Sequence, residues 1–172
     1  QLAAAQNIKP GVDWSYVYYR DAAFVLGLGT TSREHLLSFL AKKDDPDSGG
    51  RQFPYHFSRK DLRIVSPSSA TGMQYLHAVG AGLAIKWEKS REVVYVSSGE
   101  GTTSQGDFHE ALNWASREKL PVIFHIQDNE YAISVHKSQQ TAGGSIFKMV
   151  GGYQNLARFD VDGTDYFETD LA

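Results

Sequence analysis

Residues 93–134 read VVYVSSGEGTTSQGDFHEALNWASREKLPVIFHIQDNEYAIS. Val93–Val96 is a short apolar run rich in β-branched residues, which is typical of a buried strand that ends at the serines after it. Apolar residues then recur at the spacing of one helical face, at Phe108, Ala111, Leu112 and Ala115. Pro121 ends this helix, and Val122–Ile126 has the pattern of a second strand. A crossover of this length predicts a parallel βαβ unit with a right-handed connection.

A carboxylate and a carboxamide follow the two predicted strands. Glu100 stands between Gly99 and Gly101 after the first strand, and Asn129 follows the second. We expect both side chains at the carboxyl edge of the sheet, where open α/β folds bind ligands. Their oxygens suit Mg²⁺ or Ca²⁺ better than zinc. The glycines allow close backbone approach to phosphates, and the following helix N-terminus favours anions. The pattern therefore predicts a metal–diphosphate site.

The composition excludes several other classes of protein. A chain of 172 residues predicts one domain with a core of useful size. The net charge of −3 gives no reason to expect a nucleic-acid partner, and no apolar run approaches the roughly 20 residues of a membrane span. The absence of cysteine excludes disulfides and thiolate metal sites. The chain lacks an initiating Met and stops within DYFETDLA, so we expect an incomplete fragment of a longer chain.

The motif GEG…DN, with Glu100 and Asn129 separated by 29 positions, resembles the thiamine-diphosphate motif GDG…NN. The surrounding sequence segments GEGTTSQGDFHEALNWA, LPVIF and NEYAIS resemble the alpha subunit of the decarboxylating first component of 2-oxo acid dehydrogenase complexes. The resemblance implies an α/β fold with helices on both faces of a parallel sheet, in a single diphosphate-binding domain over residues 1–172. Two features favour the branched-chain type of this family: Glu100 stands in place of the usual Asp, and residues 50–56 have the sequence GRQFPYH.

The resemblance implies two cofactors, thiamine diphosphate and Mg²⁺. The metal ligands would be Glu100, Asn129 and the backbone carbonyl of Tyr131. The guanidinium of Arg20 suits phosphate oxygens because it binds them bidentately and keeps its charge; the alternative is a surface arginine paired with a nearby acid. The full set of residues expected to bind the cofactor is Tyr19, Arg20, Ser66, Ser68, Gly99, Glu100, Gly101, Thr102 and Asn129.

Residues 42–69 are rich in Pro, Gly and Asp and lack periodicity. Such a long irregular segment inside a compact domain more often has a functional role than none. His56 in this segment is the candidate catalytic residue, in contact with phosphate or substrate; the alternative is a solvated loop histidine. Ser66 and Ser68 belong to a serine turn whose register the sequence does not fix. Asp128 is either a loop cap or an extra charge facing the metal.

The rest of the chain predicts further elements. We expect helices at residues 20–28, at Thr31–Leu40 with a capped start, and at Met73–Trp87. The last of these carries small residues that predict one surface for close packing against a neighbour or a partner subunit, at Ala78, Gly80, Ala81, Gly82 and Ala84. Residues 158–165, RFDVDGTD, fail the spacing of a calcium loop and are expected to form a strand followed by a helix start.

The implied function is oxidative decarboxylation of a 2-oxo acid, with a branched-chain acid favoured, and acyl transfer to a lipoyl group. The resemblance implies a heterotetramer in a multienzyme complex, with a beta-type subunit or domain and a lipoyl-bearing acyltransferase as partners, and no activity without the beta-type partner. The location would be the cytoplasm in a bacterium or the mitochondrial matrix in a eukaryote. The alternatives are a pyruvate or acetoin dehydrogenase, a transketolase-like thiamine enzyme, and a non-catalytic fragment that binds a partner.

Overall fold

The computed structural model describes all residues from 1 to 172. Seven α-helices, six strands and four short 3₁₀ helices (labelled η) follow one another along the chain. Their bounds are α1 Leu2–Asn7, β1 Trp14–Tyr16, α2 Ala22–Gly27, α3 Ser32–Phe39, β2 Ile64–Val65, α4 Met73–Glu88, β3 Val94–Gly99, η1 Glu100–Ser104, α5 Gly106–Glu118, β4 Val122–Gln127, β5 Tyr131–Ala132, β6 Val135–His136, η2 Lys137–Gln139, η3 Ala142–Gly144, α6 Ile146–Met149, η4 Val150–Gly152 and α7 Tyr166–Leu171.

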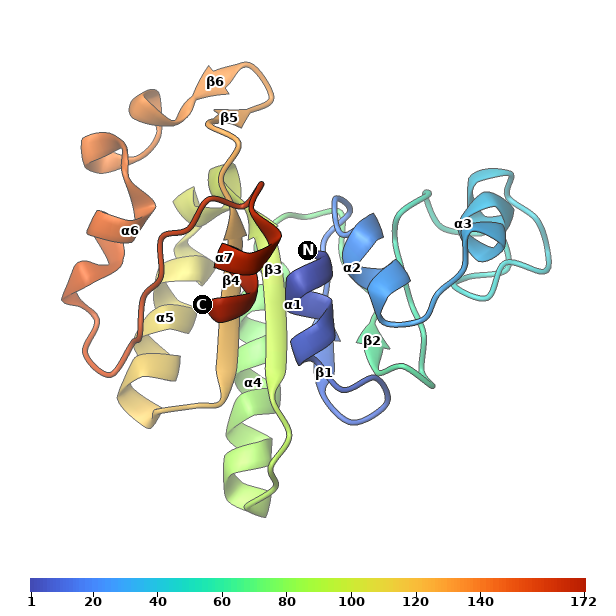
Figure 1. Cartoon of the computed structure of the whole chain (residues 1–172), viewed down its shortest axis with the longest axis horizontal. Helices are drawn as coiled ribbons and strands as arrows, with labels where there is room; N and C mark the ends of the chain where they lie inside the picture. The colour runs from blue at the N-terminus through green and yellow to red at the C-terminus, as the bar shows by residue number, and fades with distance from the viewer.

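The main sheet has four parallel strands in the order β2-β1-β3-β4 (Figure 1). β3 and β4 pair in register from Val94 with Val122 to Gly99 with Gln127, which confirms the predicted βαβ unit. The chain moves from β1 to β2 on one side of the sheet and then returns to build β3 and β4 on the other side. The strand order therefore reverses between β1 and β3, and crevices at such points bind ligands in open α/β sheets.

β3 is longer than its apolar run predicts, because it continues through Ser97 and Ser98 to Gly99. All six of its residues are buried. The two serines are tolerated inside the sheet because their polar groups have partners. Ser97 Oγ donates to the Asp21 carboxylate, and Ser98 Oγ is hydrogen-bonded to the Tyr75 hydroxyl. Paired hydroxyls remove the cost of burying polar groups, so hydrophobicity alone placed the end of this strand too early.

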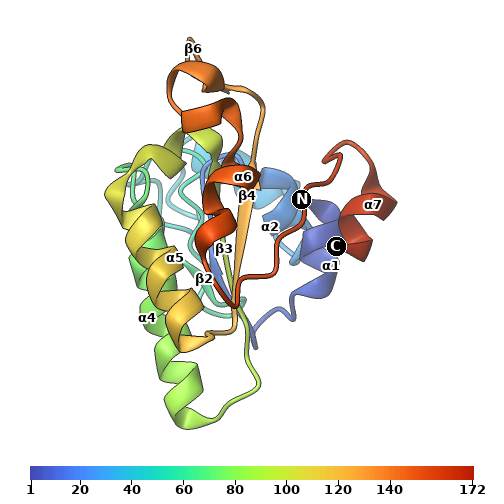
Figure 2. The ribbon, with the colours of Figure 1, turned by 90° about the vertical axis from the view of Figure 1, so that its left-hand side faces the viewer.

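Helices cover both faces of the sheet, as predicted (Figure 2). α4 and α5 lie on one face, where the larger apolar cluster includes Tyr75, Val96, Phe108 and Leu112. On the other face lie α1, α2 and α7, and a second cluster joins α1 and α2 to the sheet through Phe24 and other residues. Side chains that alternate along the central strands fill both clusters, so the sheet is buried from two sides.

The amphipathic helix α5 buries the predicted face completely, at Phe108, Ala111, Leu112 and Ala115. It ends at Glu118, three residues before Pro121. Lys119 ends it by adopting the left-handed conformation (φ 52°), and its N–H bonds back to the carbonyls of Ala115 and Ser116. A left-handed cap of this kind satisfies carbonyls that a helix end would otherwise leave unpaired.

The prediction of one small-residue surface on α4 is wrong. Ala78 and Gly82 are buried, whereas Gly80 and Ala84 are exposed. Residues four apart share a helical face and residues two apart do not, so these two pairs point to different sides of the helix. Only Gly82 is packed closely: a Cβ added to it would lie 2.7 Å from Cγ2 of Val122.

The predictions for two irregular regions, residues 42–69 and 158–165, also need correction. The irregular segment contains β2, a two-residue strand too short to show periodicity. Residues 158–165 form no strand, so β4 remains the edge of the sheet. The expected helix start after them is confirmed: Asp165 caps α7, which packs against α1 through a bond from Asn7 Nδ2 to Asp170 Oδ1 (3.0 Å). No helix has the length and apolar character needed to cross a bilayer.

Candidate functional site

The residues after β1 and β3 meet at the carboxyl edge of the sheet, beside the point where the strand order reverses. Gly99 ends β3, and a Cβ added to it would lie 2.9 Å from the Tyr18 hydroxyl and 3.1 Å from Nη1 of Arg20. Only a glycine leaves room for both side chains without displacing them. The structure therefore brings the predicted residues Arg20 and Gly99 together, 79 positions apart in the sequence.

Arg20 carries a charge that no acidic side chain neutralises. It forms no ion pair with any carboxylate, and its only side-chain hydrogen bond runs from Nη2 to the Tyr19 hydroxyl at 3.4 Å. Its guanidinium carbon lies 5.3 Å and 5.4 Å from the ring centroids of Tyr18 and Tyr19. The alternative of a surface ion pair is wrong. A guanidinium held by two aromatic rings and exposed to solvent can bind an external anion.

Tyr18, which the sequence analysis did not select, is the tyrosine that reaches the glycine turn. Its side chain is 5% exposed, whereas Tyr19 is 48% exposed. Burial raises the pKa of the Tyr18 hydroxyl, and the neighbouring Tyr19 and the negative charge of Glu100 raise it further, although Arg20 opposes them. The hydroxyl therefore stays protonated and can donate a hydrogen bond. The sequence Tyr18-Tyr19-Arg20 contains nothing that predicts which of the two tyrosines reaches the glycine turn.

Glu100 is a buried carboxylate with an unused oxygen. It begins η1, is 1% exposed, and its Oε1 has no hydrogen-bond partner. The turn is fixed by Thr103, whose hydroxyl donates to the Glu100 carbonyl at 2.6 Å. A buried carboxylate oxygen without a partner is costly, and a bound cation would remove that cost. The donor chemistry of the turn therefore fits Mg²⁺.

The other predicted metal ligands lie in the loop after β4. Asn129 is exposed, and its Oδ1 accepts from the Tyr131 backbone N–H at 3.0 Å, which leaves the second lone pair of that oxygen free. The Tyr131 ring packs edge-on against His136 at 5.1 Å. The loop touches the glycine turn, since a Cβ on Gly101 would lie 2.5 Å from Cβ of Ala132. No group of three or more His, Cys, Asp or Glu residues forms a metal site, so a cation here would rely on one carboxylate and on neutral oxygens.

Asp128 caps the loop. Its Oδ1 accepts from the Glu130 N–H at 2.8 Å, and its Oδ2 pairs with Nζ of Lys137 at 3.0 Å. Both oxygens are engaged within the loop, so the negative charge is neutralised by Lys137 and does not act as a free metal ligand. Of the two interpretations that the sequence left open, the structure supports the loop cap.

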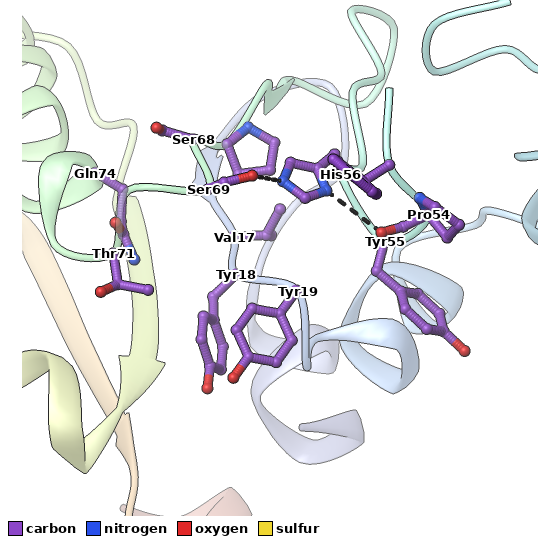
Figure 3. Close-up of a pocket in the computed structure, with 12 residues that line it drawn as sticks. Val17, Tyr18, Tyr19, Pro54, Tyr55, His56, Ser68, Ser69, Thr71 and Gln74 are labelled. Carbon is purple, nitrogen blue, oxygen red and sulfur yellow. Dashed lines mark hydrogen bonds between the residues drawn. The ribbon is translucent and has the colours of Figure 1, made fainter. Parts of the chain in front are cut away.

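A cavity of about 270 Å³ opens beyond the ends of β1 and β2 (Figure 3). His56 lies at this cavity, with Nε2 at 2.6 Å from Ser69 Oγ and Nδ1 at 3.3 Å from the carbonyl of Pro54. The histidine is therefore oriented from both sides rather than free in solvent. The cavity is lined by Val17, Tyr18, Tyr19, Phe53, Pro54, Tyr55, His56, Pro67, Ser68, Ser69, Thr71 and Gln74.

The structure fixes the register of the serine turn. Ser69, which was not predicted, bonds to His56, whereas Ser68 accepts from the Ala70 N–H at 3.1 Å and Ser66 bonds to Ser58 Oγ at 2.6 Å. Ser66 does not line the main cavity and lies instead at a neighbouring one of about 90 Å³. The sequence could not separate these serines because the turn has no periodicity to fix its register.

The serine turn is also adjacent to the glycine turn. Gly72 has a φ of 103°, and a Cβ added to it would lie 3.2 Å from the Gln105 side chain and 3.6 Å from Cγ2 of Thr102. Thr102 is one of the predicted cofactor-binding residues, and its side chain is buried at this junction. The segment that carries the serine turn is therefore in contact with the residues that follow Glu100.

A buried hydrogen-bond network holds the Arg20 segment against the strands. Asp21 accepts from the Tyr18 N–H at 2.9 Å, from Ser97 Oγ, and from Nε2 of Gln127 at 2.5 Å. It thus connects the loop after β1 to β3 and β4. Burial raises the pKa of the Asp21 carboxyl, while the three hydrogen bonds act to lower it. Asp21 falls at the start of the helix predicted for residues 20–28, and the sequence does not predict this buried role.

Comparisons with known proteins agree over the whole chain. The family described as dehydrogenase E1 component matches residues 1–172. The chain is 44% identical to the 2-oxoisovalerate dehydrogenase subunit alpha of Bacillus subtilis (strain 168), over 98% of this chain and 51% of that protein. It is 36% identical to the mitochondrial 2-oxoisovalerate dehydrogenase subunit alpha of Caenorhabditis elegans, over 95% of this chain and 38% of that protein. The human mitochondrial protein of the same name is 39% identical over 69% of this chain and 26% of its own length. The chain thus spans about half or less of these relatives.

Proposed function

Because the chain belongs to the dehydrogenase E1 component family, we propose that it is the diphosphate-binding part of an alpha-type subunit of a thiamine-diphosphate-dependent 2-oxo acid dehydrogenase. Residues 1–172 would form a single diphosphate-binding domain within a longer chain. The reaction is the oxidative decarboxylation of a branched-chain 2-oxo acid, with transfer of the acyl group to a lipoyl group. The names of the relatives support this choice of substrate.

One observation carries the proposal. An arginine without an acidic partner lies against Gly99, and a buried carboxylate with an unused oxygen directly follows this glycine, where the strand order of the sheet reverses. A cation bound to Glu100 and an anion bound to Arg20 would neutralise both groups at once. A magnesium ion bound together with a diphosphate would supply both charges, since magnesium normally binds through one or two carboxylates plus substrate phosphates.

We assign the parts of the site as follows. When bound, thiamine diphosphate supplies the nucleophilic carbon and the electron sink for the loss of CO₂. In this chain, Glu100, Asn129 and the Tyr131 carbonyl would hold Mg²⁺. The phosphate oxygens would be bound by Arg20, by the backbone of the Gly99–Gly101 turn, and by hydroxyls of the proposed contacts Tyr19, Ser66, Ser68 and Thr102.

The cavity beside the turn is the proposed place of the 2-oxo acid. Its walls include Val17, Tyr19 and Phe53, which give an apolar surface for a branched aliphatic side chain. His56 is the catalytic candidate. Its imidazole is oriented by Ser69 and by the Pro54 carbonyl, which engage both ring nitrogens, so a substrate carboxylate would bind Nε2 in place of the Ser69 hydroxyl.

The partners follow from the same proposal. The relatives are named as alpha subunits, so we propose that a beta-type subunit or domain completes the site and that a lipoyl-bearing acyltransferase accepts the acyl group. The location would be the cytoplasm in a bacterium and the mitochondrial matrix in a eukaryote. Without the beta-type partner the chain would be inactive.

The test uses the full-length chain together with its beta-type partner. Calorimetric titration should show binding of thiamine diphosphate that requires Mg²⁺, and decarboxylation should be faster with 2-oxoisovalerate than with pyruvate. Glu100→Ala should abolish the Mg²⁺-dependent binding, whereas Glu110→Gln, at an exposed position on α5, should leave it unchanged.

The outcomes separate the candidate functions. Absence of cofactor binding, or binding that survives Glu100→Ala, would overturn the metal assignment. Binding without decarboxylation of any 2-oxo acid would indicate a non-catalytic partner-binding role. Preference for pyruvate, cleavage of acetoin or ketol transfer would replace the branched-chain assignment with another thiamine enzyme.

A further inference from the structure

Four buried polar side-chain atoms in the chain lack a hydrogen-bond partner: Ser15 Oγ, Glu100 Oε1, Gln140 Nε2 and Thr141 Oγ1. Ser15 lies within β1, but Glu100 follows β3, and Gln140 and Thr141 lie between η2 and η3, after the β5–β6 hairpin. Native proteins rarely leave such groups unpaired, and an unpaired group in a native structure calls for an explanation. Three of the four fall in the turn and the loop at the carboxyl edge of the sheet.

Gln140 lies directly against the glycine turn. Its Oε1 is 3.6 Å from the position of a Cβ on Gly101, and Ala132 of β5 lies against the same glycine. The amide group is therefore beside the peptide that follows Glu100. Its Nε2 is buried, so the N–H groups do not point to bulk solvent.

The loop holds Gln140 in place. The backbone N–H of Gln140 donates to the Lys137 carbonyl at 3.1 Å, and that of Thr141 donates to the same carbonyl at 2.8 Å. Lys137 is anchored in turn by ion pairs with Asp128 at 3.0 Å and Glu130 at 3.2 Å. The backbone at Gln140 is therefore already fixed, so a ligand would have to order only the side chain.

The two unpaired groups beside Gly101 are chemically opposite. Glu100 Oε1 is an acceptor that a cation would satisfy, whereas the Gln140 amide nitrogen carries only donors and cannot bind a metal. A donor requires an acceptor, and a phosphate oxygen bound to the same cation would provide one. We propose that Gln140 donates a hydrogen bond to a diphosphate oxygen of the cofactor whose Mg²⁺ is held by Glu100. This inference rests on the proposed function and adds a binding residue to it.

The test again uses the full-length chain with its beta-type partner. Titration with thiamine diphosphate at saturating Mg²⁺ should show about tenfold weaker binding for Gln140→Ala, because a hydrogen bond to a charged group is lost. Gln140→Glu should weaken binding more, since it replaces the donor with a negative charge. Inorganic pyrophosphate with Mg²⁺ should lose affinity by a similar factor, because the contact is to the diphosphate. Gln139→Ala, at the exposed neighbouring position, is the matched control and should bind like the parent.

Stability without cofactor separates binding from a structural role. Gln140→Ala should melt at the same temperature as the parent or higher, because it removes a donor that has no partner in the protein. Unchanged affinity in Gln140→Ala, or a loss of stability in the absence of cofactor, would overturn the inference. If the parent itself fails to bind thiamine diphosphate, the proposed function is wrong. If the parent binds and both Gln140 variants bind equally well, only the role of Gln140 is wrong.

Discussion

Nη1 of Arg20 lies 3.1 Å from the point where a Cβ on Gly99 would be placed. The Tyr18 hydroxyl lies 2.9 Å from the same point, and Tyr18 is buried. The end of β3 and the loop after β1 are therefore packed to the limit that a glycine allows. This contact joins the two halves of the sheet at the point where the strand order reverses.

The first prediction concerns this contact. Gly99→Ala should displace the Arg20 and Tyr18 side chains and weaken binding of Mg²⁺–thiamine diphosphate by at least about tenfold, the loss of one charge-assisted hydrogen bond. Calorimetric titration of the full-length complex measures the effect. Gly152→Ala is the control, because an added Cβ there meets no atom within 4 Å. Equal affinity of the two variants would show that the packing around Gly99 does not position the anion site.

A second prediction compares two glycines of α4. Gly80→Ala should stabilise the chain by up to about 1 kcal/mol, because the position is exposed and alanine favours a helix interior. Gly82→Ala should destabilise it by about 1–3 kcal/mol, because the new methyl group would meet Val122. Urea unfolding monitored by circular dichroism gives both free energies. Similar shifts for the two variants would contradict the packing of α4 against β4.

The third prediction concerns the start of α3, which has a complete capping box. The Thr31 side chain accepts from the Glu34 N–H at 3.2 Å, and the Glu34 carboxylate accepts from the Thr31 N–H at 2.7 Å. Thr31→Ala should cost about 1 kcal/mol of unfolding free energy. Thr31→Ser should retain most of the stability, because its hydroxyl can make the same bond. Denaturant unfolding checks this, and an unaffected alanine variant would mean that the cap does not contribute.

The fourth prediction concerns pH. Burial lowers the pKa of His125 to about 4, and its Nδ1 is hydrogen-bonded to the Tyr95 hydroxyl at 2.6 Å. A histidine in the unfolded chain has a pKa of about 6.5. Between this pH and the lower pKa of the folded state, the unfolded state binds a proton at His125 and the folded state does not. The unfolding free energy should therefore fall by up to about 3 kcal/mol as the pH drops from about 6.5 to about 4.

His125→Gln should lose most of this dependence on pH, although it is less stable at neutral pH. His136→Gln, on the β5–β6 hairpin, is the control and should keep the slope of the parent. Unfolding free energies measured at several pH values between 4 and 7.5 decide the matter. A parent protein whose stability does not change over this range would contradict the assignment.

Much of the fold could be predicted because it depends on local patterns. The apolar face of α5 predicted which residues are buried, and the motif Thr31–Glu34 predicted a capped helix. The strand–helix–strand pattern predicted a parallel βαβ unit, and the family resemblance implied helices on both faces of a parallel sheet. The same reasoning failed for the strand expected within residues 158–165, because a strand needs a partner and the sequence pattern alone does not supply one.

The candidate site could be predicted only in part. The sequence selected Arg20 and the Gly99–Gly101 turn, and the structure brings them together. It gave no reason to select Tyr18, Ser69 or Gln140, because their role depends on which neighbours the fold places beside them. Asp21 was also missed, since its three partners come from three separate segments.

The sequence by itself determined the β3–α5–β4 unit, the apolar face of α5, and the residue types available for a metal–diphosphate site. Each of these depends on neighbours within a few positions along the chain. Only the tertiary structure decided which side chains meet. It placed Arg20 against Gly99, used both oxygens of Asp128 within its own loop, and brought Gln140 beside Gly101. The physical reason is that burial and hydrogen bonding depend on contacts between distant segments, and the packing of the sheet and its helices fixes those contacts.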